Sequence, residues 1–316
     1  MSGRDRDRRV QETLDRLAER EHVVASNGIE IAYDEFGNTG DPAMLLVMGL
    51  GMQLVAWDER FCETLVARGY RVIRFDNRDV GHSTKLDSRK MPGRAAMLTG
   101  TGRPAYLLSD MAADAVGLLD HLGIERAHVV GVSMGGMICQ TMAIEHRQRV
   151  HSIASVMSST GSRWFRMPKW RAMVTLMAKP PSDADAYMDL VTRTFEVIGS
   201  PRYPMAPERF RELMQVSYRR SFYPPGVARQ LHAINCSGNR ARRLRRLDLP
   251  ALVVHGGSDP LIRPAAGRAT ARAIPEARLK MIEGMGHDLP EQLWPEIVDA
   301  IDANARRGGV KVGTAA

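Results

Sequence analysis

The sequence predicts an α/β fold: a doubly wound, mostly parallel sheet interrupted by one long helical insert. Short β-rich runs alternate with helical patterns along most of the 316 residues, which is typical of a parallel sheet covered by helices. The run at 43–49 is apolar throughout, as expected of a strand buried on both faces. The alternation breaks at 159–236, where the pattern is helical and rich in methionine and aromatic residues. An insert this long predicts a cap that follows the sixth strand.

The elements can be placed in chain order. Asn27-Gly28 lies between two strand-like runs and predicts a hairpin over 21–37. A long loop is expected after the strand at 70–76. The remaining predicted strands are 43–49, 127–133, 150–158, 250–257 and 277–284, and the predicted helices are 56–69, 109–123, 134–146, one from about 264, and 291–304.

This order predicts four parts of the chain. They are a charged N-terminal arm at 1–21, an α/β core at 22–158 and 237–305, a helical cap at 159–236 and a flexible tail at 306–316. The N-terminus has no apolar stretch typical of a secretory signal, and no apolar run reaches the roughly 18 residues of a membrane span. Together with only three cysteines, Cys62, Cys139 and Cys236, these features favour a cytoplasmic protein.

The net charge of +8 is unevenly distributed. Residues 202–246 hold eleven arginines against Glu208 and Glu212, and five of these arginines fall in RARRLRR at 240–246. Charge runs are usually solvated, so a solvated helix face is expected there, with peripheral contact with anionic lipid as the alternative. No zinc-finger, RNP or homeodomain pattern accompanies the arginines, so no nucleic-acid partner is predicted.

A candidate nucleophile lies between a predicted strand and a predicted helix. The sequence G-V-S-M-G at 131–135 has the G-x-S-x-G pattern of a sharp strand-to-helix turn that holds Ser133 above the sheet. The alternatives are a phosphate-binding or dinucleotide-binding loop. A phosphate loop needs G-K-[ST], which is absent, and Ser133 stands where a dinucleotide fingerprint needs glycine.

A serine hydroxyl needs a histidine to take its proton and an acid to orient that histidine. In this type of sheet the expected chain order is Ser, acid, His. His287 lies in a glycine-rich loop after the last predicted strand and is the predicted base. Asp259, just past the end of another strand, is the predicted acid, and Asp288 is the second candidate. His255 ends a strand and is interpreted as a structural histidine.

A tetrahedral intermediate needs two N–H donors for its oxyanion. The Met134 N–H directly follows the candidate nucleophile and is the first predicted donor. The loop after the strand at 43–49 reads M-G-L-G-M at 48–52, and its two glycines permit a tight turn. The Leu50 N–H is therefore the second predicted donor.

These motifs resemble the α/β-hydrolase superfamily over roughly residues 25–305. MGLG (48–51) stands where many members have H-G-x-G, FDNRDVGHST (75–84) resembles the D-x-R-G-x-G-x-S loop with Asp79 at its first glycine, and GVSMGG, GGSDPLI and GMGHDLP complete the set. Together they look most like serine carboxylesterases of the aclacinomycin methylesterase-like branch. The resemblance implies a core with a helical cap, no cofactor and no metal, and hydrolysis of carboxylic esters.

The expected activity is therefore ester hydrolysis through an acyl-enzyme on Ser133, with a small-molecule ester as partner. Met52, Trp164, Trp170 and Phe222 are candidates for an apolar substrate pocket, and the core of the cap is the alternative place for each. A thioesterase, a lipase or phospholipase, a C–C hydrolase and a perhydrolase would use the same residues. A ligand-binding protein on the same fold is the alternative outside enzymes.

Overall fold

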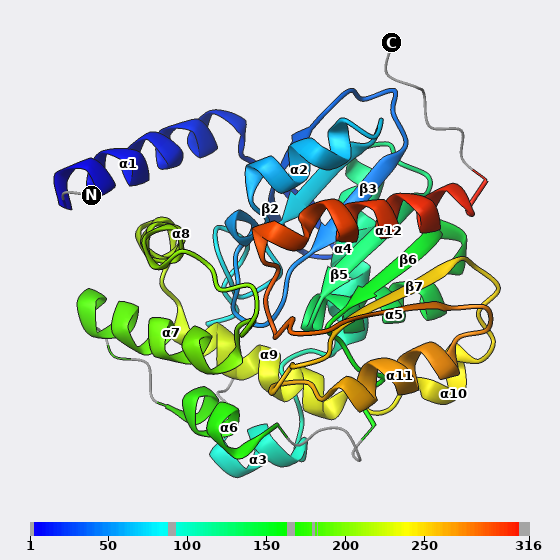
Figure 1. The fold of residues 1–316 in the computed structure, drawn as a ribbon. Coiled ribbons are helices and arrows are strands. Elements are labelled where there is room, and N and C mark those ends of the chain that lie inside the picture. The colour runs from blue at the N-terminus through cyan, green and yellow to red at the C-terminus, as the bar shows by residue number, and fades with distance from the viewer. Residues whose placement is uncertain (1–2, 88–92, 163–167, 179–180, 182, 310–316) are drawn as a thin grey trace.

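The computed structural model describes residues 3–87, 93–162, 168–178, 181 and 183–309. Eight strands form a sheet in the order β1-β2-β4-β3-β5-β6-β7-β8 (Figure 1). The β1–β2 and β2–β4 pairs are antiparallel and the other pairs are parallel, so the predicted fold class is confirmed. The strands are β1 (His22–Ser26), β2 (Ile29–Phe36), β3 (Ala43–Val47), β4 (Arg71–Phe75), β5 (Ala127–Val132), β6 (Val150–Val156), β7 (Ala251–Gly256) and β8 (Arg278–Ile282).

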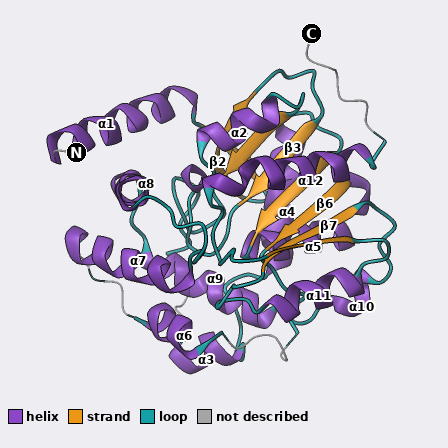
Figure 2. Cartoon of the chain, in the orientation of Figure 1, coloured by secondary structure: helices purple, strands orange, loops and turns teal. Residues whose placement is uncertain are grey.

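The central strands are buried because helices cover both faces of the sheet (Figure 2). Along β3, Leu45 and Val47 join one apolar cluster, whereas Met44 and Leu46 join the other, since successive side chains of a strand point to opposite faces. The first cluster includes α4 (Leu108–His121) and α5 (Met134–Glu145), and the second includes α2 (Glu59–Val66) and α12 (Trp294–Arg306). The apolar run in the sequence is thus explained by burial on both sides.

A crevice is expected where neighbouring strands connect to opposite faces. Strands β3 and β5 are neighbours in the sheet, but the chain continues from β3 to α2 on one face and from β5 to α5 on the other. The carboxyl ends of β3 and β5 therefore form the edge at which the fold leaves room for a ligand.

The predicted hairpin is confirmed, with Ser26 opposite Ile29 and positive φ angles at Asn27 (48°) and Gly28 (77°). The long loop after β4 differs from the prediction in one respect, because it contains the short helix α3 (Arg94–Thr99). Near the C-terminal end, α11 (Pro264–Ala273) connects β7 to β8, as predicted.

The predicted helical insert contains four helices in its described residues. They are α6 (Trp170–Met177), α7 (Ala184–Ile198), α8 (Pro207–Arg220) and α9 (Pro224–Cys236), and the short helix α10 (Ala241–Leu244) follows before β7. Figure 1 shows α6 to α9 gathered on one side of the sheet.

The N-terminal segment forms one helix, α1 (Gly3–Arg20), which packs against α8. Its apolar residues Val10 and Leu17 are buried in a cluster with Val216 of α8. Arg219 of α8 is also 2.8 Å from Asp7. The charged arm is thus anchored to the insert by a narrow apolar stripe and by ion pairing.

The arginine-rich segment is only partly solvated. Arg242, Arg243, Arg245 and Arg246 are exposed, as expected, but Arg240 is buried, so the prediction is wrong for that residue. Its guanidinium donates to Gln140 Oε1 (3.1 Å) and to the Ser159 carbonyl (3.0 Å). Arg240 therefore ties the chain leaving the insert to the residues that enter it.

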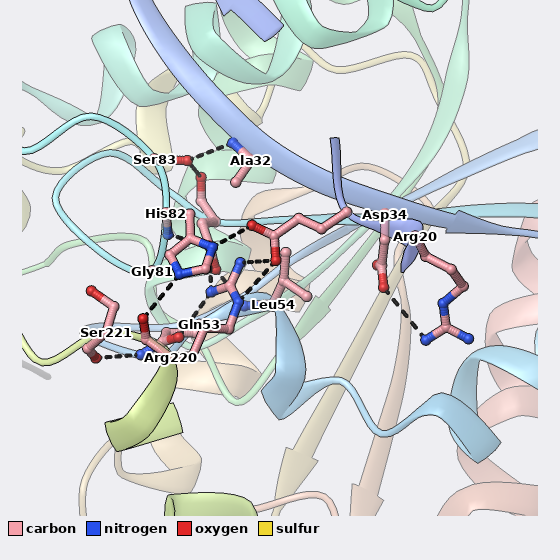
Figure 3. A network of polar contacts seen from close by, with 12 residues as sticks. Arg20, Ala32, Asp34, Gln53, Leu54, Gly81, His82, Ser83, Arg220 and Ser221 are labelled. Atoms are coloured by element: carbon pink, nitrogen blue, oxygen red, sulfur yellow. Dashed lines mark hydrogen bonds and ion pairs between the residues drawn. The ribbon is translucent and has the colours of Figure 1, made fainter. Parts of the chain in front are cut away.

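A polar network joins the end of the arm, α8 and the loop after β4 (Figure 3). Arg220 at the end of α8 lies 2.7 Å from Glu21 and 2.6 Å from the buried carboxylate of Asp76. His82 lies 2.5 Å from Glu21 through Nδ1 and 2.9 Å from the Arg220 carbonyl through Nε2. Both partners of the His82 ring are acceptors, so the ring makes both hydrogen bonds only when it is protonated.

The stability that this network contributes should depend on pH. The hydrogen bond to Glu21 raises the pKa of His82 above its ordinary value of 6.5, although burial opposes the shift. Burial disfavours ionised Glu21, but His82 and Arg220 outweigh it and lower the pKa of Glu21 below 4.5. The contribution of His82 should be complete below pH 6.5 and lost as pH rises through its raised pKa. It should also disappear as pH falls through the lowered pKa of Glu21.

Melting temperatures of wild type and His82→Gln, compared from acid to mildly alkaline pH, check this expectation. The two curves should differ most between pH 4.5 and 6.5 and converge on either side. His121→Gln, at an exposed histidine of α4, is the matched control and should follow wild type. A constant difference in melting temperature between wild type and His82→Gln at every pH would contradict a protonated His82 that binds both Glu21 and the Arg220 carbonyl.

Candidate active site

Ser133 occupies the turn between β5 and α5. Its backbone has φ 56° and ψ −117°, which is unusual for a residue other than glycine. The turn is tight, because a Cβ added to Gly131 would lie 2.3 Å from the Gly135 carbonyl carbon. A Cβ added to Gly135 would lie 2.0 Å from the Val47 carbonyl oxygen. The glycines of the motif thus let strand and helix approach each other and hold Ser133 at the carboxyl edge of the sheet.

His287 connects Ser133 to Asp259. The loop after β8 places His287 Nε2 3.1 Å from Ser133 Oγ and His287 Nδ1 2.7 Å from Asp259 Oδ2. The backbone N–H of His287 donates to the Ile198 carbonyl at the end of α7 (2.7 Å), which fixes the loop. The structure therefore brings the three residues together in the order predicted from the sequence.

Asp259 is fully buried in the loop after β7. Its Oδ1 accepts the N–H groups of Leu261 (2.8 Å) and Ile262 (2.9 Å), while Oδ2 faces His287. His255 lies 3.6 Å from Oδ2, but burial lowers its pKa, and its Nε2 is 2.8 Å from the Ile262 carbonyl. His255 is thus a buried, neutral structural histidine, as interpreted from the sequence. The carboxylate is held with one oxygen directed at the His287 ring.

The second acid candidate, Asp288, points elsewhere. Its carboxylate accepts the hydroxyl of Ser200, which follows α7, and Ser200 Oγ accepts the Gly286 N–H (2.8 Å). Burial raises the pKa of Asp288, although the Ser200 hydrogen bond opposes the shift. Asp288 thus joins the His287 loop to the insert.

The loop after β3 passes beside the serine. A Cβ added to Gly49 would lie 3.8 Å from Ser133 Oγ, and Asn77 Nδ2 supports the loop by donating to the Met48 carbonyl (3.0 Å). Within the described residues, no protein acceptor binds the N–H of Leu50 or Met134. Neither N–H is thus engaged by the protein there, and their binding of an oxyanion stays a prediction.

The candidate pocket residues lie in different surroundings. Met52 packs against both the core cluster and the apolar cluster of α7 and α8. The Phe222 ring lies 4.9 Å from those of Tyr187 and Tyr218, inside the insert. Trp170 is 69% exposed and lines a cavity of about 710 Å³ that reaches Asp288 but not Ser133. Trp164 is outside the described residues.

A larger cavity of about 1020 Å³ lies between α1, α2 and α8, and neither Ser133 nor His287 lines it. No group of three or more His, Cys, Asp or Glu side chains suited to a metal ion occurs among the described residues. In the same part of the chain, no helix is both long and apolar enough to cross a membrane.

Comparison with known proteins shows to which family the chain belongs. The profile of the α/β-hydrolase fold matches residues 42–292, and the chain belongs to this family. It is 26% identical over 309 residues to rhodomycin D methylesterase of Streptomyces peucetius, covering 91% of this chain and 99% of that relative. It is 25% identical to 3-oxoadipate enol-lactonase 2 of Acinetobacter baylyi, covering 83% and 88% of the two chains. The crystal structure of the enol-lactonase from Burkholderia xenovorans LB400 superposes with a TM-score of 0.65 at 25% identity, covering 92% of this chain and all of the other.

Proposed function

We propose that this chain, a carboxylic ester hydrolase, cleaves small-molecule esters through an acyl-enzyme formed on Ser133. The observation that carries the proposal is the hydrogen-bonded series from Ser133 Oγ through His287 to Asp259 at the carboxyl edge of the sheet. In such a series the histidine takes the serine proton and the acid orients the histidine, which makes the serine hydroxyl a nucleophile.

The reaction follows from the positions of these groups. Ser133 Oγ attacks the ester carbonyl carbon while His287 Nε2 takes the hydroxyl proton. The oxyanion that forms accepts hydrogen bonds from Leu50 N–H and Met134 N–H. When the intermediate collapses, His287 returns the proton to the leaving alcohol and the acyl group remains on Ser133. Water, activated by His287, then releases the carboxylic acid and restores the serine.

The relatives support an ester substrate, because they are a methylesterase and enol-lactonases, and a lactone is a cyclic ester. Thioesters, long-chain lipid esters, C–C bonds and peracid formation are the competing substrates and reactions, and a ligand-binding protein without turnover is the competing class. Turnover of p-nitrophenyl esters, measured beside acyl thioesters and a vinylogous 1,5-diketone, tests the proposal. Turnover of the oxygen esters should be the fastest, and no turnover of any ester would overturn the proposal.

Met52 should influence the choice of substrate, because it lies two residues after Leu50 and packs against both the core and the insert. Met52→Ala should change the preference among p-nitrophenyl esters of increasing acyl length. Each buried methylene is worth ~0.8 kcal/mol, so changes of about fourfold per methylene are expected. Val174→Ala, at an exposed position of α6, is the control. If the Met52→Ala profile overlays that of wild type, Met52 does not line the pocket.

A further inference from the structure

We infer that Gln230 on α9 is a positioning residue for the oxyanion loop, 48–52, so that this loop holds its donor geometry only while α9 is docked against it. The inference rests on the proposed function of Ser133. It assigns to the insert a part in transition-state stabilisation, in addition to any part in substrate binding.

Gln230 bridges two loops, the oxyanion loop after β3 and the loop after β4. Its side-chain Oε1 accepts the Gly51 N–H (2.8 Å) and its Nε2 donates to the Arg78 carbonyl (2.8 Å). The side chain is completely buried. The Gln230 amide thus binds a donor of the oxyanion loop and an acceptor of the loop after β4. The position of each loop therefore depends on Gln230.

The two glycines of the oxyanion loop give its backbone conformational freedom that the hydrogen bond from Gly51 to Gln230 restricts. Gly49 and Gly51 flank Leu50, and Gly51 has φ 69°, so several backbone conformations are open to this stretch. The Gly51 N–H belongs to the peptide group next to the one that carries the Leu50 N–H. Fixing the Gly51 N–H therefore restricts rotation of the neighbouring peptide and keeps the Leu50 N–H directed toward the oxyanion position. It also satisfies a donor that is partly removed from solvent.

Neighbouring residues of α9 hold Gln230 in place. A Cβ added to Gly226 would lie 2.0 Å from the Asp79 carbonyl oxygen, so the helix touches the backbone of the loop after β4. Arg229 Nε and Nη2 each lie 2.8 Å from the Asp79 carboxylate. Val227 packs on Gly51, with its Cγ2 2.9 Å from the position of an added Cβ. Consecutive turns of α9 thus contact both loops, which makes the position of Gln230 reproducible.

Gln53 provides a matched control. It is also a buried glutamine close to the same loop, and it also joins the core to the insert, because its Nε2 donates to the Ser217 and Ser221 carbonyls (2.7 Å each). It contacts no N–H of residues 48–51 in the described structure. Loss of Gln53 should therefore loosen the insert and leave the oxyanion donors in place.

The test compares Gln230→Met and Gln53→Met in the full chain by steady-state kinetics on a p-nitrophenyl ester. Gln230→Met should lower kcat by about 10- to 100-fold. A misplaced oxyanion donor loses much of the transition-state stabilisation that is lost when the donor is removed. Its KM should change much less. The affinity for an alkylboronic acid, which forms a tetrahedral adduct on the serine, should fall by the same factor. Gln53→Met should keep kcat and boronic acid affinity near wild type. Gln230→Asn, too short to reach Gly51, gives the same test if the methionine variant does not fold.

Two results would overturn the inference: wild-type kcat and boronic acid affinity in Gln230→Met, or equal losses of kcat in the two methionine variants at matched melting temperatures. Ser133→Ala distinguishes this failure from failure of the proposed function. If Ser133→Ala retains wild-type turnover, both the proposed function and the role of Gln230 are rejected. If only Ser133→Ala is inactive and Gln230→Met behaves as wild type, the proposed function stands and the role of Gln230 is rejected.

Discussion

Ser133→Ala should reduce the turnover of p-nitrophenyl esters by about 10⁴- to 10⁶-fold, as expected when a catalytic serine is removed. The reason is that the alanine variant has no nucleophile for the carbonyl carbon, and His287 has no hydroxyl proton to take. The fold should remain intact, because Ser133 Oγ contacts the His287 ring while the turn itself is held by backbone hydrogen bonds such as that from Ser133 N–H to the Val156 carbonyl (2.8 Å). Steady-state kinetics and a thermal melt check both parts.

Ser152→Ala is the control for this variant. Ser152 is a buried serine near the N-terminal end of β6, whereas the candidate site lies at the carboxyl ends of the strands. Its hydroxyl pairs with His128 (2.8 Å). We expect it to retain wild-type turnover. Comparable activity in Ser133→Ala and Ser152→Ala would mean that the nucleophile lies elsewhere.

Asp259→Asn should lower kcat by about 10³- to 10⁴-fold. If the amide oxygen keeps the hydrogen bonds from the Leu261 and Ile262 N–H groups, the NH₂ donor faces His287 Nδ1. If the amide is flipped, a neutral oxygen faces His287 and both backbone hydrogen bonds are lost. The imidazole is then held in the wrong tautomer, or its protonated form loses the negative charge that stabilises it. The same p-nitrophenyl assay measures the loss.

Asp288→Asn should cost far less activity, because the carboxylate of Asp288 is bound to the Ser200 hydroxyl. Asparagine retains an oxygen that can accept this hydrogen bond. If Asp288→Asn is instead the more damaging variant, the orienting acid is Asp288 and the role proposed for Asp259 is wrong.

The sequence predicts the fold and the three residues that meet at its edge because both depend on local patterns. The apolar run of β3 indicates burial on two faces, and the glycines around Ser133 indicate a tight turn. His287 and Asp259 could be selected because each follows a strand, and parallel strands bring their carboxyl ends to the same edge.

The sequence does not reveal features that depend on how the insert packs. Arg240 belongs to a run of charges, which predicts a solvated side chain. Its burial becomes visible only in the structure, where it contacts Gln140 of α5 and the Ser159 carbonyl. Gln230 lies 179 positions from the N–H that it accepts, in a helix whose sequence has no motif. Trp170 and Phe222 are aromatic residues of the insert, but composition does not determine which face of the insert each occupies. The sequence pattern does not predict helix α3, because it is a short helix inside a loop.

The most direct test of Ser133 as the nucleophile is to treat the wild-type protein with a fluorophosphonate probe and to locate the adduct by peptide mass mapping. The probe forms a covalent bond with a serine only where a base activates the hydroxyl and donors stabilise the tetrahedral adduct. We expect a single adduct on the peptide that contains Ser133, and none in Ser133→Ala. An adduct on another residue, or no adduct in a folded wild-type protein, would contradict this role of Ser133.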